Sequence, residues 1–220
     1  MTEQQRDRLQ IAIDSYAFPP DYFDFFRNAP QRLADTRAVE VAIGRELKSG
    51  DPEQVKNGLS NVLYWGYAQM GIRETRVHRF RAKVTDSQLK QAGELFRRSD
   101  LPSVVRIKKL GMPEFSGLSF VSKIRMFLDP YNSATLDWQI MKIHKHCATT
   151  VLAQLCAGNS TQIRITDRNS DAYEAWCRRM SDISRVHFGG RFRAVDIERG
   201  LFHLIQRGNV EIAAQILKEA

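Results

Sequence analysis

The 220-residue sequence has no long apolar run and no repeated or low-complexity segment. No stretch approaches the roughly 18 apolar residues that a membrane-spanning helix needs. The N-terminal stretch MTEQQRDRLQ also lacks the apolar core of a signal peptide. We therefore expect a protein that makes no membrane contact and resides in the cytoplasm.

Cysteine is scarce as well. Cys147, Cys156 and Cys177 are separated by 9 and 21 residues (147 to 156 and 156 to 177). These spacings do not match the close cysteine pairs of a structural zinc site. An odd number of cysteines also argues against a disulfide framework and for a reducing compartment. We expect no metal and no cofactor.

Positive charge, by contrast, is in excess. The chain has 33 Lys and Arg against 25 Asp and Glu, which gives a formal net charge of +8. A surplus of this size favours a polyanionic partner, most simply nucleic acid. Hydrophobic residues make up 43% of the chain, enough to bury one core or two small ones.

Apolar residues recur at helical spacing along most of the chain, which predicts an all-α protein. The residue types found at helix ends predict several boundaries. These are an N-cap at Asp51 with Pro52 behind it, a capping box of Thr85 and Gln88, N-caps at Asp196 and Asn209, and a stop at Gly208. Further helices are expected from 119 or 120 to 129, from Asp137 onward, and over 172–186. Only short pieces such as Gln162–Ile165 are strand-like.

The stretch from Glu114 to Ile143 is the most informative part of the sequence. It predicts a short hairpin around Gly117, a helix that carries Lys123, a turn, and Asp137 at the head of another helix. Exposed backbone N–H groups and a helix N-terminus together can bind a phosphate without reading sequence. The candidate contacts to a DNA backbone are Ser116, Gly117, Leu118, Ser119, Lys142 and Lys145. Basic runs such as Arg73–Arg81 are further candidates.

Lys123 and Asp137 are the candidate catalytic residues. Lys123 lies in an otherwise apolar run, where desolvation lowers the pKa of an amine and makes it nucleophilic. A carboxylate at Asp137 can stabilise a developing positive charge. A structural interpretation stands beside each: a lysine that extends to solvent, and an aspartate that only caps a helix.

This order of hairpin, lysine-bearing helix, turn and aspartate resembles the helix-hairpin-helix DNA glycosylase superfamily. The matching segments are FSGLSFVSK and TLDWQIMKI. Within that superfamily the chain is most similar to the 8-oxoguanine glycosylase-like branch, where a lysine follows a small hydroxyl residue, as in Ser122-Lys123. The resemblance implies a two-layer helical fold with the active site in the interdomain cleft.

The sequence departs from the family pattern at the hairpin. Ser119 stands where a second glycine is usual, and Lys123 follows it by four residues instead of two. An ungapped alignment puts Val121 in the lysine's position, as in members that excise bases without a lysine nucleophile. Both alignments remain open at this point.

The resemblance implies a monomeric enzyme that flips a damaged or modified base out of double-stranded DNA and cleaves its N-glycosidic bond. The default base is an oxidised purine such as 8-oxoguanine, and Lys123 would add lyase activity through a Schiff base. In a bacterium such an enzyme would be associated with the nucleoid. Candidates for the base pocket are Trp138, Gln139, Trp65 and Tyr64.

Three alternatives remain beside this hypothesis, one of them an all-α protein-interaction domain in which the basic balance is incidental. The other two bind DNA. One is a glycosylase that excises hypermodified bases of phage DNA in antiviral defence, and the other is a non-catalytic helix-hairpin-helix module that only binds DNA. The expected domains are residues 50–150, with the motif at 115–143, and a second helical domain made of 1–49 and 151–220.

Overall fold

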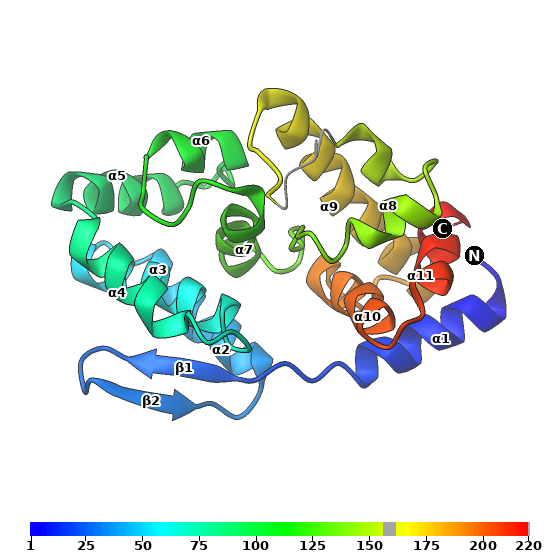
Figure 1. Cartoon of the computed structure of the whole chain (residues 1–220), viewed down its shortest axis with the longest axis horizontal. Coiled ribbons are helices and arrows are strands. Elements are labelled where there is room, and N and C mark those ends of the chain that lie inside the picture. Colours follow the sequence, from blue (N-terminus) through cyan, green and yellow to red (C-terminus); the bar gives the residue numbers. More distant parts are fainter. Residues whose placement is uncertain (156–161, 220) are drawn as a thin grey trace. The chain divides into compact units, whose positions relative to one another are not determined.

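The computed structural model describes residues 1–155 and 162–219, and these are mostly helical, as the apolar spacing predicts (Figure 1). Cys156 lies outside the described residues. The helices are α1 Glu3–Asp14, α2 Thr36–Leu47, α3 Pro52–Gly66, α4 Arg73–Lys83, α5 Asp86–Phe96, α6 Val104–Lys109, α7 Leu118–Leu128, α8 Lys142–His146, α9 Asp167–Phe188, α10 Ala194–Gln206 and α11 Val210–Glu219. A 3₁₀ turn, η1, spans Val151–Gln154. Two short strands, β1 Asp21–Asp24 and β2 Ala29–Arg32, pair antiparallel with Asp21 opposite Arg32.

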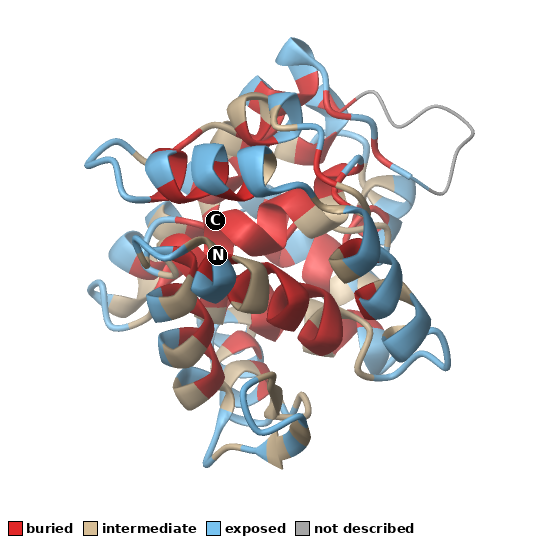
Figure 2. Cartoon of the chain, turned by 90° about the vertical axis from the view of Figure 1, so that its left-hand side faces the viewer, coloured by how far each residue is buried: buried red, intermediate tan, exposed pale blue. Residues whose placement is uncertain are grey.

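The chain divides into two compact units. Unit 1 consists of Met1–Ala17 and Pro130–Ala220, and unit 2 of Phe18–Asp129. The boundaries therefore fall at 17/18 and 129/130, not at the expected 49/50 and 150/151. The difference has a physical reason: the fully buried Val39, Ile43 and Leu47 place α2 against α3 and α7 of unit 2. Figure 2 shows helices with buried residues along one side and exposed residues along the other.

Unit 2 begins with the β1–β2 hairpin, which the sequence analysis did not predict. Neither DYFD nor APQR alternates apolar and polar residues, so no strand pattern is visible in the sequence. The turn is organised by Asp24, whose Oδ1 accepts hydrogen bonds from the backbone N–H groups of Phe26 (3.0 Å) and Arg27 (2.9 Å). By contrast, the strand-like Gln162–Ile165 contributes only an isolated bridge residue, Arg164.

A buried amide joins this hairpin to the helices of unit 2. The Asn61 side chain accepts a hydrogen bond from Phe23 N (2.8 Å) and donates to Phe23 O (3.1 Å) and to Glu46 Oε2 (3.2 Å). The Tyr22 hydroxyl donates to Glu46 Oε1 at 2.6 Å. Burial raises the pKa of Glu46, although these two hydrogen bonds oppose that shift. The hairpin is thus fixed to α2 and α3 by polar contacts.

Several predicted helix ends of unit 2 are confirmed. Asp51 caps α3 through a hydrogen bond from Glu53 N (3.1 Å), with Pro52 at the first helical position. Thr85 and Gln88 form the predicted capping box of α5. Short-range chemistry decides these positions, so local sequence was sufficient to find them.

Unit 1 has its own core, centred on α9, whose Tyr173 and Trp176 are fully buried. Helix α10 crosses α1 at Gly200. A Cβ atom there would lie 2.6 Å from Ile13 Cγ1 and 2.8 Å from Leu9 Cδ1, so glycine permits the close approach.

The start of α10 differs from the prediction. The helix begins at Ala194, with Arg193 as the N-cap, and Asp196 lies in the first turn. The Asp196 carboxylate accepts hydrogen bonds from Arg193 N (3.1 Å), Nε (2.9 Å) and Nη2 (2.7 Å). Burial alone would raise the pKa of Asp196, but Arg193 outweighs it and lowers that pKa below the ordinary 3.8. The end of α10 agrees with the prediction, because Gly208 has a positive φ of 79°.

We expect Asn61→Ala to lower the free energy of unfolding by about 1–3 kcal/mol, because the Phe23 N–H loses its buried acceptor. Urea denaturation followed by circular dichroism measures this change. Gln54→Ala, at an exposed position of the same helix, is the control and should change stability by less than about 0.5 kcal/mol. Equal stability of the two variants would contradict a fixing role for Asn61.

We expect the stability difference between wild type and Asp196→Asn to depend on pH. Because the folded pKa is depressed, the stabilisation by the Asp196 charge is fully present above the ordinary pKa of 3.8 and is lost as pH falls through the folded value. Unfolding free energies measured from pH 7 to pH 3 should show the two proteins converging at the acidic end. If the difference in unfolding free energy between the two proteins stays constant from pH 7 to pH 3, the Asp196 charge does not contribute to stability.

Candidate functional site

Unit 2 contains the first part of the predicted motif, the connection around Gly117 and the helix that carries Lys123. Helix α6 is followed by a connection over residues 110–117 and then by α7, which begins at Leu118, one or two residues earlier than predicted. Two residues of this connection adopt left-handed backbone angles, Gly111 (φ 63°) and Glu114 (φ 67°). Gly117 precedes α7 and has no side chain to cap it. The first N–H groups of α7 therefore receive no capping bond from residue 117.

The four candidate phosphate contacts of the hairpin differ in exposure. Ser116 is exposed, Ser119 is half-buried, and Gly117 and Leu118 are buried. The Leu118 side chain belongs to the core of unit 2, with no exposed surface. A contact at Leu118 would therefore have to use the backbone.

The basic helix α4 is engaged in ion pairs within unit 2. Arg76 and Arg79 reach the buried Glu114 carboxylate at 2.8 and 3.5 Å. Arg73 pairs with Asp21 at 2.7 Å. These three guanidinium groups hold the hairpin connection and β1 against α4, so the arginines of this run serve the fold of unit 2.

The Lys123 side chain lies inside unit 2 and does not extend into solvent. Lys123 is only 7% exposed. Its Nζ donates to Ser119 O (3.4 Å) and Ser119 Oγ (3.3 Å) and lies 5.1 Å from the centre of the Phe120 ring. A buried amine is costly unless it is hydrogen-bonded, and Ser119 supplies such bonds. The alternative position, Val121, is fully buried in the same helix.

Tyr64 and Trp65, two candidates for the base pocket, are packed into unit 2. Trp65 is 4% exposed, and its ring contacts Phe18 (4.6 Å between centroids) and Phe127 (5.3 Å). The Tyr64 ring lies 5.4 Å from that of Phe23 and carries the Arg73 guanidinium at 4.2 Å. Both rings thus contribute to the core. The Trp65 Nε1 is buried and has no hydrogen-bond partner among the described residues.

Asp137 belongs to unit 1, where it organises a turn. Its Oδ1 accepts hydrogen bonds from Gln139 N (2.9 Å) and Ile140 N (3.2 Å). Residues 138–141 form turns, and α8 begins only at Lys142, so the helix expected at Asp137 starts five residues later. Asp137 is half-buried. Asp137 therefore caps a turn and not a helix, and one oxygen accounts for both of these hydrogen bonds.

Helix α9 positions the segment that leads to Asp137. The Tyr173 hydroxyl donates to Ala134 O at 3.0 Å, and Trp176 Nε1 donates to Thr135 O at 3.1 Å. All four groups are buried. The backbone before Asp137 is thus bonded to side chains about 40 residues further along the chain, which no local pattern could reveal.

Tyr16, Glu198 and Arg199 were not among the candidate residues, but they interact electrostatically in the same unit as Asp137. The charges of Arg199, Glu198 and Asp137 all act on the Tyr16 hydroxyl. Burial is the largest effect and raises the pKa of Tyr16 above its ordinary value of 10. Tyr16 therefore stays protonated at neutral pH. Its position early in the chain gave no signal of this.

The remaining candidates flank Asp137. Trp138 is half-buried, and the Lys145 amine lies 5.9 Å from the centre of its ring. Gln139, Lys142 and Lys145 are exposed. These positions leave the two lysines available to an anionic partner and keep part of the indole accessible.

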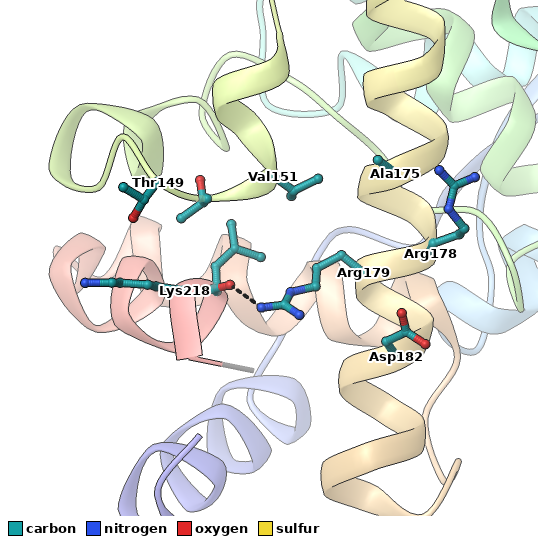
Figure 3. A pocket seen from close by; sticks show the side chains of 9 residues that line it. Thr149, Val151, Ala175, Arg178, Arg179, Asp182 and Lys218 are labelled. Atoms are coloured by element: carbon teal, nitrogen blue, oxygen red, sulfur yellow. Dashed lines mark hydrogen bonds between the residues drawn. The ribbon is translucent and has the colours of Figure 1, made fainter.

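A cavity of about 300 Å³ lies elsewhere in unit 1, between α9, α11 and residues 149–151. None of the predicted site residues lines it. Figure 3 shows the Arg178 and Lys218 side chains pointing away from each other, while Arg179 donates to Leu217 O at 3.0 Å. The cationic groups of this cavity do not converge on one point.

No protein-family model, curated protein or solved structure matches the chain. Within residues 1–155 and 162–219, no three His, Cys, Asp or Glu side chains are grouped to hold a metal ion. In the same part of the chain, no helix combines the length and apolar character needed to cross a membrane.

We expect Asp137→Ala to lower the free energy of unfolding by about 1 kcal/mol, because the turn loses its acceptor. Asp137→Asn should stay within about 0.5 kcal/mol of wild type, since an asparagine oxygen caps equally well. Chemical denaturation of the three proteins checks both values. Equal loss in both variants would show that the negative charge, and not the acceptor, stabilises the fold.

Proposed function

We propose that the protein is a DNA glycosylase of the helix-hairpin-helix type that excises a damaged or modified base, by default an oxidised purine such as 8-oxoguanine. The observation that carries the proposal is the buried amine of Lys123 in the helix that follows the hairpin connection. A buried lysine in a core helix is costly, and a nucleophile is a specific reason to retain it.

The distribution of charge supports a DNA partner. Residues 18–129 contain 19 Lys and Arg against 13 Asp and Glu, so unit 2 carries +6 of the net charge of +8. Contacts to phosphates release counterions, and the affinity for DNA then falls steeply as salt rises. The unit that contains Gly117 and Lys123 is therefore also the more basic one.

The proposed reaction begins when the target nucleotide leaves the base stack, at a cost of a few kcal/mol. The bond between the sugar C1′ and the base then breaks, and its electron pair leaves with the base. The Asp137 carboxylate stabilises the positive charge that grows on the sugar. Only one of its oxygens makes the two capping bonds, so the second has no part in them.

Lys123 takes part as a nucleophile in this proposal. Its neutral amine forms a bond to C1′ and releases a proton, which gives a Schiff base after the sugar ring opens. Loss of a proton from the adjacent carbon then breaks the strand by β-elimination. If the amine does not react, water attacks C1′ instead and the product is an intact abasic site.

We expect that one oligonucleotide in a panel of duplexes, each with a single modified base, will lose its base when incubated with the protein. Asp137→Asn should slow this release on the order of 10²- to 10³-fold, because the sugar cation loses its charge stabilisation. Asp171→Asn, at an exposed position of α9, is the matched control and should keep the wild-type rate. Released base is measured by chromatography.

A Lys123 variant distinguishes attack by the lysine, which gives a Schiff base, from attack by water, which gives an intact abasic site. Sodium borohydride should trap wild-type protein covalently on the reacting oligonucleotide, and Lys123→Gln should abolish trapping, whereas Lys90→Gln on α5 should not. Release of a hypermodified base alone would favour the antiviral role. Binding of DNA without release from any oligonucleotide would favour the non-catalytic module and contradict the proposal.

A further inference from the structure

Ser119 supplies both of the hydrogen-bond acceptors described above for the Lys123 amine. It occupies the first turn of α7, one turn before Lys123. Its hydroxyl oxygen lies 3.3 Å from Lys123 Nζ and its carbonyl oxygen 3.4 Å. The family pattern has a glycine at this position, which offers no hydroxyl. The departure from the pattern therefore adds a polar group directly at the amine.

The hydroxyl is more available to the amine than the carbonyl is. The Ser119 carbonyl already accepts a hydrogen bond from Ser122 Oγ at 3.0 Å. A hydroxyl can also donate as well as accept, so it can bond to the ammonium and to the neutral amine alike. A carbonyl accepts only. The Ser119 side chain is thus suited to hold Lys123 in both protonation states.

The aliphatic part of the Lys123 side chain packs against the end of α3 at Gly66. At Gly66, a Cβ atom would lie 3.2 Å from Lys123 Cδ and 2.6 Å from Phe120 Cε1. The Phe120 ring also packs on Tyr67, with 4.4 Å between centroids. Glycine at position 66 therefore allows both side chains to approach α3, and Phe120 and Gly66 restrict where the lysine stem can lie.

Given the proposed function, we infer that Ser119 holds the Lys123 amine in place and relays the proton that the amine releases. Its hydroxyl holds the amine at the start of α7 and links it to solvent, since Ser119 is half-buried while Lys123 is buried. When Nζ forms its bond to C1′, it releases one proton. The Ser119 hydroxyl accepts that proton and passes its own to water, so the hydroxyl is regenerated.

The test uses a duplex with a preformed abasic site, so that Schiff-base formation is measured without base excision. The full-length protein is mixed with this duplex and borohydride, and the single-turnover trapping rate at saturating protein is measured together with the Kd for DNA. Ser119→Ala should lower the rate at least about 10-fold and leave Kd unchanged, because the predicted contact of residue 119 with DNA uses its backbone N–H, which alanine keeps. Ser119→Thr, which keeps the hydroxyl, should restore most of the rate.

Ser122→Ala is the matched control, because it removes a neighbouring hydroxyl of the same helix that donates to the Ser119 carbonyl. It should trap at the wild-type rate. Circular dichroism and unfolding curves show whether each variant is folded. An unchanged rate in Ser119→Ala, or an equal loss in Ser119→Thr, would overturn the inference.

Two further results separate this inference from the proposed function. Base release by a wild-type protein that is never trapped would overturn the role of Ser119 but leave the glycosylase proposal standing. Trapping on the abasic duplex that depends on Ser119, without release of any base, would support the inference and contradict the glycosylase proposal.

Discussion

The burial of α7 is the constraint on which unit 2 depends. Every residue from Val121 to Leu128 is buried, and the helix packs against α2, α3 and α6. A helix in this position must satisfy its polar side chains within the protein. Arg125 does so by donating to Pro102 O at 2.8 Å. Lys123 does so through Ser119, which makes the placement of its amine a consequence of core packing.

In unit 1 the buried helix is α9, and its polar atoms are likewise hydrogen-bonded within the protein. Its Tyr173 and Trp176 use their polar atoms to hold the backbone that precedes Asp137. Aromatic side chains with a polar tip combine core packing with such bonds. In each unit, therefore, a buried helix fixes a group that the sequence singled out for its chemistry. Rigid support of this kind is what a catalytic group requires.

The proposals for Lys123 and Ser119 share one chemical idea. A buried amine is useful as a nucleophile only if a neighbouring group holds it and accepts its proton. In the proposal Ser119 meets both needs, since its hydroxyl lies 3.3 Å from Lys123 Nζ, and Gly66 leaves room for the lysine stem. In that proposal, Ser119, where the chain departs from the family pattern, belongs to the site.

Local sequence predicted the features that local chemistry controls. The caps at Asp51 and Thr85, the stop at Gly208 and the mostly helical content follow from side chains within a few residues of one another. The start of α8 and the short β1–β2 hairpin did not follow, because brief elements carry too little periodicity. The unit boundaries were also missed, since they depend on which helices α2 packs against.

By itself, the sequence determined the helical class and the excess of positive charge, and it singled out Lys123 and Asp137 as candidates. Only the tertiary structure decided that Lys123 is buried beside Ser119, that Asp137 also caps a turn, and that Tyr16 shares its surroundings. The physical reason is that hydrogen bonding and burial of these groups depend on residues distant in the chain. No spacing within a motif contains that information.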